Sequence, residues 1–562
     1  MIETITYKNV IENNGSDIGA VIERAIDPNV RATAMAAMES LWNKKKTQRY
    51  FADVAKLIDR SSWRDSGFGV YFATVANMKT TYGPRVLPTV NEAFNSRWEN
   101  IVEMGSGVGT IEPWPGAVEL LQAGVANPDL LTQYDSPGGT YPSRWAGAII
   151  LNTKIGKDYT QNYPVFTFKD TYITPSATYA VDVAYEAFAR STKEPGARNR
   201  VTIVGPSYYV LALSALDKGL PVTRVSSPKA QKDKINTFFP TPEELQDQML
   251  EDTGMLVLTL PNNPNGEAFG DAELGRLLEY AKKEDILVLL DLVFDQLWYQ
   301  DKVNYSIPPN PLKVAVETGM IDQMVVVDGL SKFLNLAGER VGILATKNKQ
   351  LERIINTISV SRLSNPSLTV EPLLQFEAIS RIMDTKVDPD TPQPAIDLGF
   401  ELTRRDLEKS TGNRWLERIP NYKFGEWYKG RRLWITEAMQ YYQDNLTIIN
   451  SIIERSARKS SLAPNKAAYN TLIGLGETNG NKGFDKILKM FLLTGIVSMS
   501  GQCFGIPDGG NEFWTRITYG GLSRERLPEA MARLISFLDL WDEMDLGNPQ
   551  KFPVYDTEFK VI

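Results

Sequence analysis

Short apolar, β-branched runs alternate with segments of helical pattern through the centre of the chain, and this alternation restricts the fold more than any other feature. The apolar residues within each run are continuous rather than alternating, which is typical of strands covered on both faces. Strands separated by helical segments, such as residues 271–285, indicate βαβ units and a parallel sheet. The sequence therefore predicts an α/β protein with strands over residues 200–205, 254–260, 285–291, 323–329 and 341–346.

Four of the predicted strands end in polar or turn-forming residues. Gly-Pro-Ser-Tyr-Tyr follows the first run, and Pro-Asn-Asn-Pro-Asn-Gly follows the second. Asp291 ends the third run, and Asp-Gly-Leu-Ser-Lys stands at the end of the fourth. Ligands of open parallel sheets bind outside the carboxyl ends of the strands. We therefore expect a binding site at this edge of the sheet.

Histidine is absent from the 562 residues, and Cys503 is the only cysteine. Histidine is the one side chain whose ordinary pKa lets it change charge near neutral pH, so its absence excludes Ser-His-Asp and Cys-His catalysis and His-based metal sites. A single thiol excludes an internal disulfide framework and a thiolate-only metal site. No metal site is predicted. Proton transfer must therefore rely on Lys, Asp, Glu, Tyr, water or a cofactor.

The charge and the N-terminus bear on partners and location. A net charge of −7 argues against a surface that binds nucleic acid. No run approaches the roughly 18 uninterrupted apolar residues of a membrane span. The N-terminal sequence MIETITYKNVIENNGSD lacks the basic start and apolar run of a signal peptide. We expect a cytoplasmic protein that binds neither nucleic acid nor membranes.

A specific motif follows the fourth run. Lys332 comes directly after Ser331, and Arg340 stands eight residues later between Gly338 and Gly342. A lysine amine can form a Schiff base with a carbonyl compound, and a cofactor can then act as an electron sink. This motif resembles the lysine signature of the class I/II aminotransferases, which are pyridoxal-phosphate enzymes of fold type I.

Further motifs of this family occur in the family's order over about residues 100–530. The resemblance implies that Asp291 pairs with the pyridine nitrogen of the cofactor. A carboxylate there keeps the ring protonated, because an opposite charge nearby favours the cationic form. Asn263 matches the residue that donates to the phenolic oxygen and lies near the substrate, and Tyr208 matches the aromatic residue that stacks on the ring.

The phosphate site and the substrate site are implied in the same way. Arg516 falls where the family places the arginine that binds the substrate α-carboxylate, and a planar guanidinium suits a planar carboxylate. Tyr134 resembles the tyrosine that reaches the phosphate from the neighbouring subunit, which implies a homodimer or a larger homo-oligomer. The remaining phosphate ligands would be Arg340, Ser331 and the residues before a predicted helix, namely Ser176, Ala177 and Thr178.

The resemblance implies a mostly parallel seven-stranded central sheet with helices on both faces, plus a smaller C-terminal α+β domain. The predicted parts are a helical extension over 1–95, a pyridoxal-phosphate-binding domain over 96–365, and a small domain with a helical insertion over 366–562. The helical pattern after about residue 347 is interrupted by a predicted loop at 384–399. The extension and the insertion are similar to those of the aspartate 4-decarboxylases, a larger branch of the same fold.

Several residues depart from the family pattern. Phe294 replaces the tyrosine that also contacts the phenolic oxygen, and Gly329 replaces a serine that binds phosphate. The histidine that supports the ring-nitrogen acid in aspartate aminotransferase is absent, so another group must orient Asp291. Arg362 lies near the place of a second arginine in dicarboxylate-specific members, two residues out of register with that pattern.

The favoured function is therefore an aminotransferase that moves the amino group of an α-amino acid to a 2-oxo acid, with Lys332 relaying the proton. A lyase on the same fold is the alternative: an enzyme such as a 4-decarboxylase that breaks or replaces a bond at Cβ. A regulator with an aminotransferase-like sensing domain is a third hypothesis. The near-neutral N-terminal region argues against it, because such regulators carry an N-terminal DNA-binding unit.

Overall fold

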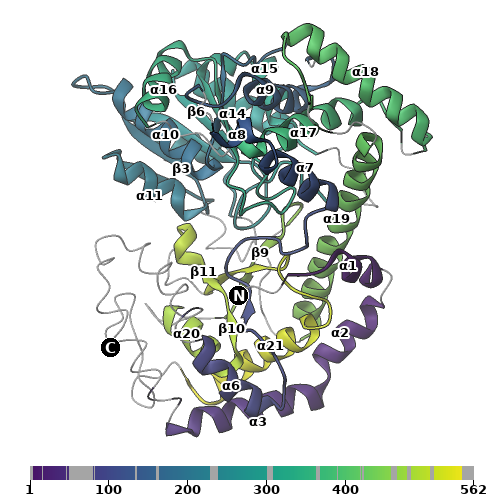
Figure 1. Cartoon of the computed structure of the whole chain (residues 1–562). Coiled ribbons are helices and arrows are strands. Elements are labelled where there is room, and N and C mark those ends of the chain that lie inside the picture. Colours follow the sequence, from purple (N-terminus) through teal and green to yellow (C-terminus); the bar gives the residue numbers. More distant parts are fainter. Residues whose placement is uncertain are drawn as a thin grey trace.

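The protein forms two lobes, one around a large sheet and one around small sheets and helices from both ends of the chain (Figure 1). The computed structural model describes residues 4–14, 17–45, 47, 49, 80, 83–132, 136–159, 164–227, 238–299, 308–362, 368–388, 390–417, 419, 423–456, 465–476, 483–506 and 512–546.

A seven-stranded sheet forms the centre of the first lobe, in the order β2-β8-β7-β6-β5-β3-β4. Neighbouring strands are parallel except for β8, which pairs antiparallel with β2 and β7. The prediction of a mostly parallel seven-stranded sheet is thus confirmed. All five predicted runs form strands of it. The strands are β2 (Thr171–Thr174), β3 (Arg200–Val204), β4 (Val222–Val225), β5 (Thr253–Thr259), β6 (Leu287–Asp291), β7 (Met324–Gly329) and β8 (Gly342–Thr346).

Successive side chains of the central strands enter two different cores, which explains the continuous apolar runs. In β5, Met255 belongs to one core and Leu256 to the other. The helices of the first core are α10 (Ala177–Ser191), α11 (Tyr209–Asp217) and α16 (Lys349–Arg362). The helices of the second core on this sheet include α9 (Tyr141–Ile155), α14 (Asp271–Lys283) and α15 (Pro311–Glu317). Burial on both faces therefore favours apolar residues throughout the strand interiors.

The second lobe contains an antiparallel sheet in the order β11-β12-β9 and a parallel pair, β1 with β10. Its helices come from both ends of the chain, and α3 packs along α21. Arg31 of α3 forms an ion pair with Asp539 of α21. The strands are β1 (Val102–Glu103), β9 (Asn470–Gly474), β10 (Ile496–Val497), β11 (Met499–Ser500) and β12 (Trp514–Thr518). The helices are α1 (Tyr7–Asn13), α2 (Ile18–Ile26), α3 (Pro28–Asn43), α6 (Gly83–Phe94), α20 (Gly483–Thr494) and α21 (Leu527–Glu543).

A long helix, α19 (Phe424–Arg455), connects the two lobes. It packs against α18 (Gln393–Thr411) at one end and against α2 at the other. The prediction of a loop over residues 384–399 is partly wrong, because α18 begins at Gln393. Pro394 occupies its first turn, where proline is tolerated because that amide has no intrahelical partner. The other helices include α7 (Pro115–Val125), α8 (Pro128–Thr132), α13 (Pro242–Gln248) and α17 (Glu371–Asp384).

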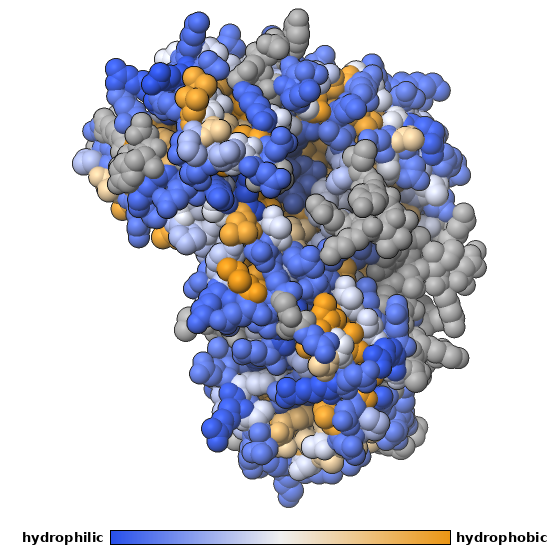
Figure 2. Space-filling view, turned by 90° about the vertical axis from the view of Figure 1, so that its right-hand side faces the viewer, coloured by the Kyte–Doolittle hydropathy of each residue, from blue (hydrophilic) through white to orange (hydrophobic). Residues whose placement is uncertain are grey.

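The face of the molecule shown in Figure 2 is mostly hydrophilic, and its apolar residues lie in separate patches. Within the described ranges, every helix is too short or too polar to cross a membrane. The division of the chain into parts at residues 95 and 365 stays a prediction.

Candidate active site

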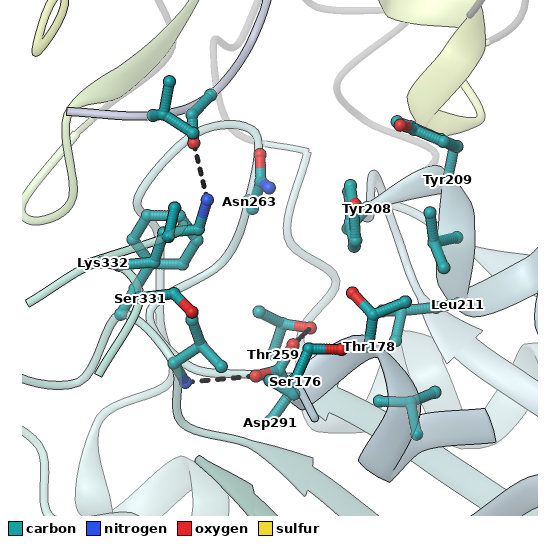
Figure 3. A pocket seen from close by; sticks show the side chains of 18 of the residues that line it. Ser176, Thr178, Tyr208, Tyr209, Leu211, Thr259, Asn263, Asp291, Ser331 and Lys332 are labelled. Carbon is teal, nitrogen blue, oxygen red and sulfur yellow. Dashed lines mark hydrogen bonds between the residues drawn. The ribbon is translucent and has the colours of Figure 1, made fainter. Parts of the chain in front are cut away.

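A cavity of about 270 Å³ lies at the carboxyl ends of β5, β6 and β7 (Figure 3). The N-termini of α10 and α11 and a loop of residues 105–111 complete its wall. The predicted residues that line it are Ser176, Ala177, Thr178, Tyr208, Asn263, Asp291, Ser331, Lys332, Arg340 and Arg516. The cavity therefore lies at the edge of the sheet where a site is expected, and its role as a binding site stays a prediction.

Lys332 follows β7 and extends into the cavity. Its Nζ donates a hydrogen bond of 2.8 Å to the carbonyl of Gly107. Burial lowers the pKa of Lys332 to about 8, and the positive charge of Arg516 acts in the same direction. At pH 7 roughly a tenth of this amine is neutral, against roughly one part in 3,000 for an ordinary lysine. Lys332 can therefore act as a nucleophile and as a base near neutral pH.

Asp291 ends β6 at the floor of the cavity, and its side chain is held by two neighbours. Its carboxylate accepts a 3.1 Å hydrogen bond from the amide of Val293 and lies 3.5 Å from the hydroxyl of Thr259. Thr259 is the residue opposite Asp291 in the pairing of β5 with β6. These two groups hold the Asp291 carboxylate in its orientation.

Burial and, to a smaller extent, the nearby carboxylate of Asp328 together raise the pKa of Asp291 to about 6. No cation of the described residues lies within ion-pair distance of Asp291. A buried carboxylate without a cation costs free energy, so this position suits a ligand that brings a positive charge or a proton.

A buried ion cluster lies beside Asp291, and sequence reasoning did not find it. Lys154 of α9 contacts Asp328 at 2.8 Å and Asp295 at 3.0 Å. Lys154 is the one charged residue of the apolar stretch AGAIILNTKIG. A lone charge in such a helix indicates a buried partner of opposite charge. Asp295 and Asp328 are thereby compensated, whereas no cation of the described residues pairs with Asp291.

Arg516 lies on β12 and reaches the cavity from the second lobe. Its guanidinium donates to Asn263 at 3.0 Å and to the carbonyl of Gly105. Its Nε is buried and, within the described part of the chain, has no hydrogen-bond partner. Burial lowers the pKa of Arg516 to about 10. The unsatisfied donor and the planar fork suit a carboxylate ligand.

The opposite side of the cavity offers donors for an anion. Ser176 caps α10 by accepting a 3.0 Å hydrogen bond from the amide of Tyr179, so Ala177 and Thr178 form the first turn of the helix. A Cβ at Gly342 of β8 would overlap the backbone of Ser176, so this glycine allows strand and helix to approach closely. Free amides and the helix dipole favour a phosphate at such a position.

The remaining predicted residues differ in how they relate to the cavity. Tyr208 precedes α11 and lies across the cavity from Lys332 (Figure 3). Arg340 lines the cavity but is exposed, and its Nη1 donates to the carbonyl of Ala337 at 3.3 Å. Phe294 also lines it, with its ring centre 5.7 Å from Lys332 Nζ. Tyr134 lies outside the described residues.

Arg362 does not reach the cavity. It ends α16, and its guanidinium forms ion pairs with Glu186 and, at 3.5 Å, with Asp182. Both carboxylates belong to α10, against which α16 packs on the outer side of the sheet. The geometry therefore separates Arg362 from the site that Arg516 enters.

The comparisons with known proteins agree with this geometry. Residues 151–376 match the family model described as aminotransferase class I and II. An aspartate aminotransferase of Sulfurisphaera tokodaii is 25% identical over 248 residues, which cover 42% of this chain and 57% of that protein. Kynurenine–oxoglutarate transaminase 1 of Mus musculus is 26% identical over 252 residues, which cover 44% of this chain and 55% of that protein. The match thus spans less than two thirds of these curated relatives.

Solved structures share the fold. The aspartate aminotransferase from Rhizobium meliloti matches with a TM-score of 0.57 at 15% identity, covering 81% of this chain and 94% of that structure. At this identity the likeness speaks for the fold alone, which is that of a fold type I α/β protein.

Proposed function

We propose, from the premise that residues 151–376 belong to the class I and II aminotransferase family, that this protein is a pyridoxal-phosphate-dependent aminotransferase. It would move the amino group of an α-amino acid to a 2-oxo acid. One observation carries the proposal. A lysine with a lowered pKa, a buried acid that pairs with no cation of the described residues and a buried arginine with a donor that none of them uses face the same cavity.

The residues of the cavity fit pyridoxal phosphate. Asp291 would accept a hydrogen bond from the ring nitrogen, and Tyr208 would stack on the ring. Asn263 would donate to the phenolic oxygen. When bound, the cofactor supplies an aldehyde that condenses with amines and a ring that takes up an electron pair. The phosphate would be held by Ser176, Ala177, Thr178, Ser331 and Arg340.

The chain's own groups account for the proton transfer. Arg516 would bind the substrate α-carboxylate in the fork now occupied by the carbonyl of Gly105 and by Asn263. The Nζ of Lys332 would take the proton from the substrate Cα and deliver it, on the same face, to the aldehyde carbon of the cofactor. A pKa of about 8 suits both directions, because the neutral and the charged form are each populated near neutral pH.

The assembly and the location belong to the same proposal. A homodimer would let Tyr134 of one subunit reach the phosphate of the other, and the enzyme would act in the cytoplasm. The extension over 1–95, the cofactor domain over 96–365 and the C-terminal domain over 366–562 would be its parts.

The test is amino-group transfer by purified protein loaded with pyridoxal phosphate. The protein is incubated with a panel of amino acids, with and without a 2-oxo acid. We expect a keto acid to form only when the acceptor is present. Release of carbon dioxide or ammonia without an acceptor would instead identify a lyase acting at Cβ, and no reaction with any amino acid would contradict both.

Uptake of the cofactor should depend on pH with a midpoint near 8. Neutral amine is the form that attacks an aldehyde, and the pKa of Lys332 is lowered to about 8, so the neutral fraction rises as pH increases through this value. Asp291, with a pKa of about 6, is already ionised there. Stopped-flow absorbance of cofactor-free protein mixed with pyridoxal phosphate measures the rate. A midpoint near 10.5 would show that burial does not activate Lys332.

Arg516→Lys should raise the KM for the amino acid by on the order of 100-fold, because lysine cannot form the paired hydrogen bonds of a guanidinium. Cofactor affinity should change much less. The KM is measured by steady-state kinetics, and the cofactor affinity by a spectral titration. The same substitution at Arg362 should change neither, since that guanidinium lies outside the cavity. A larger loss of cofactor binding than of substrate binding in Arg516→Lys would contradict the carboxylate role.

A further inference from the structure

The turn that carries Lys332 is held from outside the cavity by a residue that the mechanism does not use. Asn335 stands three residues after Lys332. Its backbone amide donates a hydrogen bond of 3.4 Å to the backbone carbonyl of Lys332, which closes this turn. Its φ is +54°, in the left-handed region that asparagine tolerates better than most residues. Such a conformation persists where the surroundings hold it.

The side chain of Asn335 joins three separate parts of the chain. Its Nδ2 donates to the hydroxyl of Tyr442 at 2.8 Å and to the carbonyl of Ile111 at 3.2 Å. Tyr442 lies on α19 and is only 1% exposed, so its position is fixed by packing. Ile111 belongs to the 105–111 loop. The turn that carries Lys332, the 105–111 loop and α19 are therefore joined through the side-chain amide of Asn335.

The 105–111 loop contacts the reacting groups directly. The carbonyl of Gly107 accepts the hydrogen bond from Lys332, and that of Gly105 accepts one from Arg516. A Cβ at Gly109 would overlap the side-chain oxygens of Asn335 and Tyr442, so the loop backbone lies against this pair. The bonds of Asn335 thus set the spacing between Lys332 and the loop.

The neighbouring residue is held from the same direction. Guanidinium groups of Arg381 and Arg431 lie 4.5 Å and 5.5 Å from the ring centre of Phe333. Both arginines pair with the fully buried Glu377 of α17, at 2.5 Å and 2.6 Å. The turn after Lys332 is therefore fixed by α17 and α19 at two successive contacts.

We propose that Asn335, held by Tyr442, is a positioning residue that fixes the Lys332 amine against the 105–111 loop. The proposal rests on the role of Lys332 in the proposed function. Without this tie the turn relaxes, the amine becomes more hydrated, and its pKa rises towards that of an ordinary lysine. Since small displacements of a reacting group are costly, kcat falls while the Arg516 contact, and with it KM, is retained.

The test compares three variants of the full chain, each prepared cofactor-free for the uptake measurement and loaded with pyridoxal phosphate for the kinetics. Tyr442→Phe removes the hydroxyl that accepts from Asn335. Asn335→Gly removes the side-chain amide but keeps a residue that tolerates a positive φ. Tyr441→Phe is the matched control: this residue is equally buried on the same helix, but its hydroxyl contacts Leu522 and Arg524 instead. Each variant is measured for thermal stability, for kcat and KM, and for the pH midpoint of cofactor uptake.

We expect Tyr442→Phe and Asn335→Gly to lower kcat by on the order of tenfold and to raise the pH midpoint above 8. Tyr441→Phe should lose similar stability but keep the wild-type midpoint. If Tyr442→Phe and Tyr441→Phe behave alike, or if Asn335→Gly keeps the wild-type midpoint, the positioning role is refuted. The midpoint needs no transfer activity. Wild-type protein that takes up the cofactor without transferring amines would therefore refute the proposed function alone.

Discussion

Lys332→Ala is expected to lower amino-group transfer by on the order of 10⁴-fold, the largest effect of any single substitution in this chain. The variant loses the nucleophile that attaches the cofactor and the base that moves the substrate proton. Borohydride reduction followed by peptide mapping measures the attachment. Wild-type protein, which should be yellow with a band near roughly 410–430 nm, should retain reduced cofactor on the peptide that contains Lys332.

A second lysine provides the control for this experiment. Lys347 also follows directly after a strand of the same sheet, but its Nζ donates to the carbonyl of Val165 at 2.9 Å and it does not line the cavity. Lys347→Ala should keep both the reducible band and the transfer activity. If Lys332→Ala still yields a protein-bound adduct after reduction, Lys332 is not the residue that attaches the cofactor.

Asp291→Asn should lower kcat by on the order of 10²- to 10³-fold. A nearby carboxylate raises the pKa of a cationic partner, here the ring nitrogen, by about 1–3. Asparagine removes this effect while nearly preserving the shape of the side chain. The ring nitrogen would lose its proton at neutral pH, which weakens the cofactor as an electron acceptor. The measurement combines steady-state kinetics with a pH titration of the cofactor absorbance.

Asp328→Asn is the matched substitution, because it makes the same chemical change on the adjacent strand. The negative charge of Asp328 raises the pKa of Asp291, so its removal should lower that pKa below about 6 and extend activity to lower pH. Lys154 would keep Asp295 as its partner. Equal losses of kcat in both variants would contradict a direct contact between Asp291 and the ring nitrogen.

The part of the site that could be predicted from the sequence is the part built on the sheet. Asp291 and Lys332 end strands whose apolar runs are continuous, and parallel strands place their carboxyl ends at one edge. Arg516 could be found through the resemblance alone, because nothing in its local sequence indicates that β12 of the second lobe faces this edge. Arg362 shows the limit of such matching, since its carboxylate neighbours on α10 are remote in sequence.

The contacts that could not be predicted are those between elements far apart in the chain. Lys154 of α9 meets Asp328 of β7 although the two are remote in sequence, and Tyr442 meets Asn335 across 107 positions. Local periodicity assigns such residues to helices but cannot say which helix faces which turn. The start of α18 at Gln393 has a more local cause, because prolines indicate a loop and also suit the first turn of a helix.

The packing of α3 along α21 has a consequence for biosynthesis. Arg31 and Asp539 are separated by 508 positions, so this partner of α3 leaves the ribosome long after α3 itself. At about 5–20 residues per second this interval is roughly 25–100 seconds. Throughout that time α3, whose residues Met38, Leu41 and Trp42 are buried in the finished protein, can pack only on its early neighbours α2 and α6 and lacks α21. The central sheet can form meanwhile, so the nascent chain would carry a folded lobe and an α3 that is only partly covered, a state in which chaperone binding competes with aggregation.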